Sequence, residues 1–191
     1  MPDSPAVMSS KATLRTALLA ARAGRSPAER ATAADAVADV LAARLAGAAV
    51  VAAYVPAPEE PGHGRLPDAL PGRVLLPVVP ARGRELSWAE HTGLLAPGRF
   101  GLQEPTGPRL PPAALATADV VVVPALAVAA DGTRLGRGGG FYDRALAHAR
   151  ADAVLVAVVF DEELLPAVPA GPHDRRVAAV VTPAAGWRQL A

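Results

Sequence analysis

The sequence predicts a single α/β domain built around a mostly parallel β-sheet. Short apolar runs suited to buried strands recur along the chain and alternate with segments whose apolar residues have helical spacing. Strands that alternate with helices are typical of a layered domain with a parallel sheet. The 191 residues contain no internal repeat and no linker long enough to divide them, and this length suits one domain with a substantial core.

Helices are predicted from apolar spacing and from capping signals. Residues 1–10 are expected to form a loose, flexible tail, and one apolar face predicts a helix from Lys11 to Ala23. The sequence Ser26-Pro27-Ala28-Glu29 is a capping box with proline at the first helical position, so a second helix is expected from there to about Leu45. Two further helices are predicted near Pro67–Leu70 and over Phe141–Arg150.

Strands are predicted where apolar residues form short continuous runs, and the clearest of these is the DVVVV sequence that begins at Asp119. Three connections separate the strands. Residues 56–64 predict a loop, residues 96–112 predict an ordered but irregular turn-rich connection, and residues 124–140 predict a long loop that ends in glycines. The expected strands are Val50–Tyr54, Val74–Val79, Glu85–Ala89, Asp119–Val123, Val154–Val159 and Val177–Val181.

Composition narrows the classes of function. The formal net charge of +1 gives no support for a broad nucleic-acid or membrane-surface footprint. The absence of cysteine excludes disulfides, a cysteine metal site and a thiol nucleophile. The start of the chain lacks the features of a signal peptide, and no apolar run approaches the ~20 residues that span a bilayer. A cytoplasmic protein is therefore expected.

Lys11 is the single lysine in the chain, and all the other basic residues are arginine. The chain also has no isoleucine or asparagine, so the gene is expected to be rich in G and C. Such a bias replaces lysine by arginine wherever the two are interchangeable. The remaining lysine then marks either a position that needs a compact ammonium group or a chance survivor.

The most informative segment has the sequence RLGRGGGFYDR and runs from Arg134 to Arg144. It follows a predicted buried strand and leads into a predicted helix. Glycines allow an anion to approach the backbone closely, and N–H groups at the helix start would then point at it. The segment has neither the Gly-Lys-Ser/Thr step of a P-loop nor the third glycine of the dinucleotide fingerprint. A phosphate cradle and a flexible turn are the two interpretations.

This segment closely resembles the signature of the 5-formyltetrahydrofolate cyclo-ligase (5,10-methenyltetrahydrofolate synthetase) family. That signature begins with Arg-Leu-Gly, continues with an aromatic residue or arginine, and ends with Gly-x-Gly-Tyr-Tyr-Asp. The resemblance extends over nearly the whole chain from Lys11 and implies one Rossmann-like three-layer α/β/α sandwich over residues 11–191, with a mainly parallel sheet of about six strands. The other matching pieces are Lys11-x-x-Leu14-Arg15, Tyr54-x-Pro56, Glu60-Pro61, Phe100-Gly101-Leu102-Gln103-Glu104-Pro105, Val123-Pro124-Ala125-Leu126, His173-Asp174 and Val180-Val181-Thr182.

The resemblance implies an ATP- and Mg²⁺-dependent ligase that converts 5-formyltetrahydrofolate to 5,10-methenyltetrahydrofolate. In this reaction the formyl oxygen on N5 is phosphorylated, N10 attacks the activated carbon, and phosphate leaves. Catalysis then depends on positioning and charge neutralisation, without a covalent nucleophile. The implied partner is this small substrate, with no nucleic acid and no membrane, and the protein is expected to be a monomer.

For the nucleotide, the resemblance implies that Lys11 and Arg15 grip the ATP phosphates. The two share one face of the first predicted helix, where cations near the N-terminus oppose the helix dipole unless an anion is present; an ordinary solvated helix start is the alternative. Arg137 is the candidate for stabilising the transferred phosphoryl group, and Tyr142 is a candidate to flank the reacting groups or to pack the helix onto the sheet. The implied nucleotide contacts in the loop are Arg134, Leu135, Gly136, Arg137, Gly138, Gly139, Gly140, Phe141 and Tyr142.

For the folate, the resemblance assigns the pterin-binding carboxylate to Glu60 and a backbone contact to Val55. A carboxylate can accept two hydrogen bonds from the pterin ring N–H and 2-amino group. The adjacent Glu59 and a merely solvated loop carboxylate remain alternatives. The same loop is implied to contact the substrate through Arg137, Gly138, Gly139, Gly140 and Phe141, where phenylalanine replaces the usual tyrosine.

For the metal, the resemblance implies Asp143 and, more loosely, Asp174. A carboxylate in the first turn of a helix is stabilised by the helix dipole alone, but it is also well placed to hold Mg²⁺ against bound phosphates. Two other functions compete with the ligase. One is a sugar-phosphate isomerase or acyl transferase that uses no ATP, and the other is a non-catalytic nucleotide- or folate-binding protein.

Overall fold

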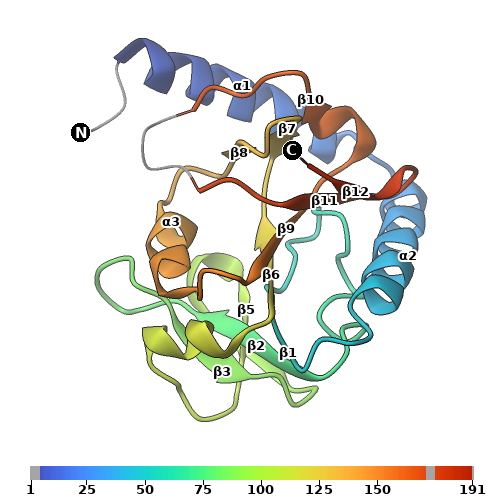
Figure 1. Cartoon of the computed structure of the whole chain (residues 1–191). Helices are drawn as coiled ribbons and strands as arrows, with labels where there is room; N and C mark the ends of the chain where they lie inside the picture. The colour runs from blue at the N-terminus through green and yellow to red at the C-terminus, as the bar shows by residue number, and fades with distance from the viewer. Residues whose placement is uncertain (1–4, 171–174, 191) are drawn as a thin grey trace.

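A computed structural model describes residues 5–170 and 175–190 and shows a mixed α/β fold around a seven-stranded sheet with the strand order β12-β11-β9-β6-β1-β2-β3 (Figure 1). The five central strands are parallel, and the two edge strands β3 and β12 are antiparallel to their neighbours. The strands of this sheet are β1 (Val50–Ala52), β2 (Arg73–Val78), β3 (Ser87–Glu90), β6 (Val120–Pro124), β9 (Val154–Val158), β11 (Ala179–Thr182) and β12 (Gly186–Gln189).

The side of the sheet on which the chain adds successive strands changes between β1 and β6, which are themselves parallel. From β1 the chain continues outward through β2 to β3, whereas from β6 it continues outward the other way through β9, β11 and β12. Ligands of open α/β sheets bind beyond the carboxyl ends of the strands at such a switch point. The loops that follow β1 and β6 are therefore the expected walls of a binding site.

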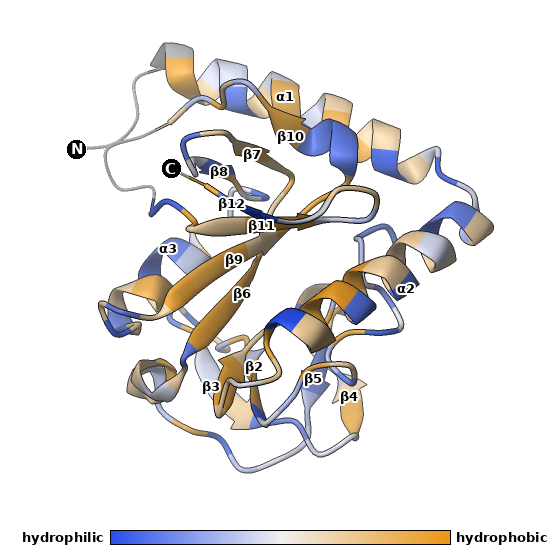
Figure 2. Cartoon of the chain, turned by 45° about the vertical axis from the view of Figure 1, so that its right-hand side comes forward, coloured by the Kyte–Doolittle hydropathy of each residue, from blue (hydrophilic) through white to orange (hydrophobic). Residues whose placement is uncertain are grey.

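Apolar residues cover both faces of the sheet. On one face the helix α2 (Pro27–Arg44) packs Val37 and Leu41 against alternate strand residues such as Val122. On the other face the short helix α3 (Phe141–Ala145) and the 3₁₀ turns at Pro112–Thr117 and Leu146–His148 cover the sheet (Figure 2). Successive side chains of a strand point to opposite faces of the sheet. Because both faces are covered, apolar residues are needed at every position, and the strands are continuous apolar runs in the sequence.

The first helix, α1 (Pro5–Ala23), does not cover the main sheet. It packs on a small three-stranded sheet with the order β10-β7-β8, through a cluster that includes Leu18 and Leu126. This arrangement places α1 near the loops that follow β6 and β9 (Figures 1 and 2). The small sheet consists of β7 (Ala127–Ala129), β8 (Arg134–Leu135) and β10 (Leu164–Leu165).

The structure corrects the predicted start of the first helix. Residues 5–10 are helical rather than part of a loose tail, since α1 begins at Pro5, a residue compatible with a first helical turn. Lys11 consequently lies beyond the first turn, and the argument that it opposes the helix dipole does not apply. The capping box is confirmed: Glu29 N donates to Ser26 Oγ at 3.2 Å, and Ser26 N donates to Glu29 Oε2 at 2.7 Å.

Other predicted elements differ in extent. The short helix expected near Pro67–Leu70 is absent, because residues 58–69 form turns in which Gly62 and Gly64 have left-handed backbone. The helix expected over Phe141–Arg150 is α-helical only to Ala145 and continues as a 3₁₀ turn. Residues 96–112 lie in a connection that includes a hairpin of β4 (Leu95–Pro97) and β5 (Gln103–Pro105) joined through a 3₁₀ turn at Arg99–Gly101, and the long loop 124–140 contains β7 and β8.

The sheet has seven strands where about six were expected, because β12 was not predicted. The mixed α/β class with a mostly parallel sheet is confirmed. In the described ranges, no helix combines the length and apolar character needed to cross a bilayer.

Candidate functional site

The buried face of α1 carries cations where an ordinary amphipathic helix carries apolar residues. Lys11, Arg15, Leu18 and Arg22 recur at helical spacing; Lys11 is only 6% exposed and Arg22 only 1%. Charged side chains are rarely buried to this extent without partners. The face is directed at the glycine loop and at the loops that follow β1 and β9, so these cations line an interior site.

Arg15 joins α1 to the glycine loop. Its Nε donates to the carbonyl oxygen of Gly136 at 2.9 Å. Gly138, which has a φ of +92°, lies so close that a Cβ placed there would be 3.3 Å from the Arg15 guanidinium carbon. Both its left-handed backbone and its close approach to Arg15 favour glycine at this position.

Arg134, at the other end of the glycine loop, is buried next to the start of α3. Its Nη2 donates to Oδ1 of Asp143 at 2.6 Å. Its Nε and Nη1 are buried without a hydrogen-bond partner in the described part of the chain. Buried N–H groups of a cation are costly when unpaired, so two donors left over beside a glycine loop are those that an anionic ligand would satisfy.

Two tyrosines approach the same centre, Tyr54 from the segment that follows β1 and Tyr142 from α3. The hydroxyl of Tyr142 is buried and, within the described residues, has no hydrogen-bond partner. Burial raises the pKa of Tyr142, and the nearby charge of Glu60 raises it further against an opposing effect of Arg134. Burial likewise raises the pKa of Tyr54, again reinforced by Glu60. Both phenols therefore remain protonated hydrogen-bond donors at neutral pH.

Glu60 lies in the loop that follows β1 and is 7% exposed. Its Oε2 accepts from the backbone N of Ala57 at 2.9 Å, and its Oε1 accepts from Nε of Arg137 at 3.0 Å. Arg137 also donates to Glu59 Oε1 at 3.4 Å. The glutamate that turns into the interior is thus Glu60, whereas Glu59 lies at the rim. The contact joins the loops that follow the two strands at the switch point.

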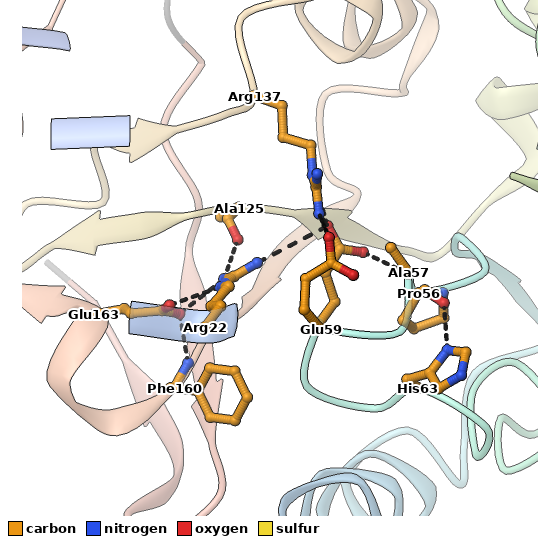
Figure 3. A network of polar contacts seen from close by, with 10 residues as sticks. Arg22, Pro56, Ala57, Glu59, His63, Ala125, Arg137, Phe160 and Glu163 are labelled. Carbon is orange, nitrogen blue, oxygen red and sulfur yellow. Dashed lines mark hydrogen bonds and ion pairs between the residues drawn. The ribbon is translucent and has the colours of Figure 1, made fainter. Parts of the chain in front are cut away.

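A second buried arginine lies behind Glu60. Nε and Nη2 of Arg22 donate to the two carboxylate oxygens of Glu163 at 2.7 and 2.8 Å, and Nη2 also donates to the carbonyl of Ala125 at 2.7 Å (Figure 3). Burial lowers the pKa of Arg22, but the hydrogen bonds and charge of Glu163 outweigh it and the pKa is raised overall. Nη1 faces Glu60, with 3.9 Å between Nη1 and Oε1.

Two phenylalanines form an aromatic contact beside the glycine loop. The rings of Phe100 and Phe141 meet edge to face with their centroids 6.3 Å apart. Phe100 is 72% exposed and has a backbone φ of 57°, a conformation that residues other than glycine rarely adopt. A strained backbone that presents an apolar ring to solvent is typical of a ligand-binding position.

A pocket of about 450 Å³ opens beside Arg137 and Glu59. Leu19 and Ala23 of α1 line one side of it, and Pro58 lies in the loop after β1. Its volume lies within the range of pockets for small ligands. The pocket therefore lies beside Arg137, the residue that is hydrogen-bonded to Glu60.

Asp143 is the predicted metal ligand that the structure describes. Asp143 stands in the first turn of α3, with about two-fifths of its side chain exposed, and it is held by Arg134. Among the described residues, no group of three acidic or histidine side chains is arranged to hold a metal ion. Asp174 lies outside the described residues. One carboxylate beside the glycine loop is compatible with Mg²⁺, which can take its other ligands from phosphate oxygens and water.

The structure brings together most of the predicted site. Arg15, Glu60 and the loop from Arg134 to Asp143 meet around one centre, Lys11 is buried on the same face of α1 as Arg15, and Val55 lies half-buried after β1. Tyr54 was noted only as part of the family pattern. The roles of Arg22 and Glu163 were missed, because nothing local in the sequence indicates a pair joined across 141 residues.

Comparisons with known proteins agree on one family. A model described as the 5-formyltetrahydrofolate cyclo-ligase family matches residues 7–183. A protein of Mycolicibacterium smegmatis named 5-formyltetrahydrofolate cyclo-ligase is 46% identical over 185 residues, which cover 93% of this chain and 95% of that protein. A mouse protein of the same name is 32% identical over 98 residues, which cover 48% of each chain.

Two solved structures share the fold. The NMR structure of Aquifex aeolicus 5,10-methenyltetrahydrofolate synthetase has a TM-score of 0.77 and 28% identity, and the match covers 94% of this chain and 92% of that one. A 5,10-methenyltetrahydrofolate synthetase from Mycoplasma pneumoniae has a TM-score of 0.69 and 20% identity, with 89% and 96% covered. The second match, at its lower identity, bears on the fold alone.

Proposed function

The chain belongs to the 5-formyltetrahydrofolate cyclo-ligase family, and from this premise we propose that it uses ATP and Mg²⁺ to convert 5-formyltetrahydrofolate to 5,10-methenyltetrahydrofolate, ADP and phosphate. The observation that carries the proposal is the buried guanidinium of Arg134. Two of its nitrogens have no hydrogen-bond partner in the described structure, and it lies at the glycine loop that α1 contacts through Arg15. This arrangement supports a polyphosphate site.

The nucleotide side of the site comprises α1 and the glycine loop. Arg15 and Arg134 supply fixed guanidinium groups, and Lys11 supplies a buried ammonium on the same helix face. The loop glycines allow phosphate oxygens to reach backbone N–H groups. A Cβ at Gly138 would crowd the Arg15 guanidinium. The set proposed for nucleotide contact is Lys11, Arg15, Arg134, Leu135, Gly136, Arg137, Gly138, Gly139, Gly140, Phe141 and Tyr142.

The folate side is the loop that follows β1. Glu60 is buried and held between Arg137 and the backbone of Ala57, and each carboxylate oxygen keeps a second lone pair for a pterin N–H. Val55 is proposed to contribute a backbone contact. The aromatic pair of Phe100 and Phe141 gives a planar ligand an apolar surface to lie against.

The reaction requires charge neutralisation more than acid–base chemistry. The formyl oxygen attacks the γ-phosphorus and ADP leaves. N10 then attacks the activated carbon and loses its proton to solvent, the C–O bond breaks, and phosphate departs with the former formyl oxygen. Arg137, 45% exposed and at the centre of the loop, is proposed to stabilise the phosphoryl group in transfer. Tyr142 is proposed to donate its hydroxyl, which has no partner among the described residues, to the reacting oxygens.

Asp143 fits a magnesium ligand, and we assign it that role together with Asp174. The metal, when bound, would neutralise phosphate charge during transfer. Arg134 holds one oxygen of Asp143 and so fixes the direction of the carboxylate. The protein is proposed to act as a cytoplasmic monomer, and the helical layers on both faces of its sheet support a Rossmann-like three-layer sandwich.

A spectroscopic assay tests the proposal. The purified protein with 5-formyltetrahydrofolate and Mg-ATP is expected to generate the near-ultraviolet absorbance of the methenyl product. Omission of ATP is expected to abolish the rise, which separates the ligase from an isomerase or acyl transferase. A protein that binds both ligands without any ATP-dependent absorbance change would instead be a non-catalytic binder.

A further inference from the structure

Arg22 is a buried cation that the proposed chemistry does not use. It is 1% exposed, and a charge at such depth is strongly unfavourable unless it is paired. Glu163 pairs with one edge of the guanidinium through two hydrogen bonds, and Ala125 accepts a third (Figure 3). Glu163 is itself held by the backbone N of Phe160 at 2.8 Å. The guanidinium plane is therefore fixed by contacts on one side.

The other side of the guanidinium faces the site. Nη1 is buried and makes no hydrogen bond to any described residue, and it lies 3.9 Å from Oε1 of Glu60. This separation is too long for a hydrogen bond, so the attraction acts through charge. Between two buried groups, 8% and 1% exposed, such an attraction is weakly screened.

Glu60 has a second cation, Arg137, which is much more exposed than Arg22. Arg137 donates to Oε1 at 3.0 Å and is nearly half exposed on the glycine loop. The proposed reaction requires Arg137 to stabilise the phosphoryl group. Once Arg137 turns away from Glu60, the contacts that remain to the carboxylate from the described residues are the Ala57 backbone N–H and the charge of Arg22.

We propose that Arg22, oriented by Glu163, is a positioning residue that keeps Glu60 directed at the pterin while Arg137 engages the phosphoryl group. The inference rests on the proposed function, since it takes Glu60 as the pterin acceptor. It separates the roles of two arginines. Arg137 is the cation that moves between substrate groups, and Arg22 is the cation that remains with Glu60.

The test must remove the charge of Arg22 without leaving Glu163 charged and unpaired. Arg22→Met/Glu163→Gln removes both charges and keeps a carbonyl for the Phe160 N–H, so it is expected to fold. If it does not, Arg22→Met/Glu163→Met replaces the pair by apolar chains. The matched control is Arg25→Met/Glu162→Gln, which removes a neighbouring ion pair whose arginine also lies over the Phe160 ring but does not face Glu60.

Steady-state kinetics of methenyl formation give the decisive comparison. The Arg22/Glu163 double variant is expected to raise the KM for 5-formyltetrahydrofolate about tenfold, with the KM for ATP within about twofold of wild type. The control is expected to change neither. Equal KM values for folate in the folded double variant and the wild type would overturn the positioning role, as would a parallel rise in both KM values. A wild-type protein without ATP-dependent activity would overturn the proposed function itself.

Discussion

Arg134, which is buried, and Asp143, which is partly exposed, form an ion pair at the start of α3, with Nη2 of the arginine 2.6 Å from Oδ1 of the aspartate. The pair orients both groups at the glycine loop. It leaves two arginine nitrogens unpartnered among the described residues and one face of the carboxylate toward solvent. In the proposed function, the two arginine nitrogens would bind a phosphate and the carboxylate would bind a metal ion.

Replacement of Arg134 by lysine is expected to lower kcat/KM for ATP by about 100-fold, because an ammonium cannot supply the forked donors of a guanidinium. The KM for 5-formyltetrahydrofolate is expected to change much less. Arg73→Lys, at the sheet edge where Arg73 pairs with Glu90, is the matched control and should behave as wild type. An unchanged ATP dependence in Arg134→Lys would remove this residue from the nucleotide site.

Replacement of Asp143 by asparagine tests the metal assignment. The amide keeps a carbonyl for Arg134 but loses the negative charge, so about tenfold more Mg²⁺ should be needed for half-maximal activity. The measurement is a titration of activity with Mg²⁺ at saturating ATP. If the titration curve of the variant overlies that of the wild type, Asp143 serves only the ion pair.

Tyr142→Phe separates a structural from a catalytic hydroxyl. Because the buried Tyr142 hydroxyl has no partner in the described structure, its removal should leave the unfolding temperature equal or slightly raised. Activity is nevertheless expected to fall, with kcat reduced about tenfold. Thermal unfolding and kcat measured on the same preparation test this, and full activity would show that the hydroxyl contacts nothing in the transition state.

Lys11→Arg tests whether the single lysine is special. Lys11 is buried, so a bulkier guanidinium would shift the position of the charge relative to the phosphates. The variant is expected to raise the KM for ATP about tenfold with an unchanged circular dichroism spectrum. Wild-type kinetics would mean that the lysine survives by chance.

Asp119 links stability to pH at the start of the sheet. Its Oδ2 accepts from the backbone N–H groups of Ala49 and Val50 at 2.8 and 2.9 Å, and Arg150 lies 3.1 Å from Oδ1. The Val50 hydrogen bond is the largest cause of a lowered pKa of Asp119. The folded pKa lies below the unfolded value of about 3.9, so the stabilisation is complete above that pH and is lost as pH falls through the folded pKa.

Asp119→Asn should therefore be less stable than the wild type at neutral pH, and the difference should shrink on acidification below about pH 4. Urea unfolding at several pH values measures this difference. A difference in unfolding free energy that stays constant down to pH 2 would contradict the linkage, since protonation would then not remove the contribution of Asp119.

The sequence predicted those parts of the molecule whose cause is local. Apolar runs indicated the central strands, and the capping box at Ser26 indicated α2. The glycine loop could be recognised from the sequence because its residues are contiguous, and its role as a phosphate site stays a prediction. The hairpin of β4 and β5 was not predicted, since Pro97 and Pro105 end its short strands and prolines weigh against strand structure. Likewise β12 is a partly exposed edge strand without an apolar run.

The contacts that complete the site could not be predicted because they depend on the fold. Arg137 and Glu60 meet only because their loops follow adjacent strands, and 77 positions separate them in the chain. Nothing local in the sequence distinguished Arg22 from Arg15 on the same helix, yet the packing of α1 on the small sheet buries Arg22 against Glu163. The sequence shows which side chains carry charge or hydrogen-bonding groups. The residues that these side chains contact from distant parts of the chain are known only from the structure.

The most direct test of the account follows the formyl oxygen. If 5-formyltetrahydrofolate labelled with ¹⁸O in its formyl group is cyclised by the wild-type protein with Mg-ATP, one labelled oxygen should appear in inorganic phosphate for each methenyl product. Mass spectrometry of the phosphate measures the transfer. Unlabelled phosphate formed together with the methenyl product would contradict phosphorylation of the formyl oxygen, and with it the role assigned to this site.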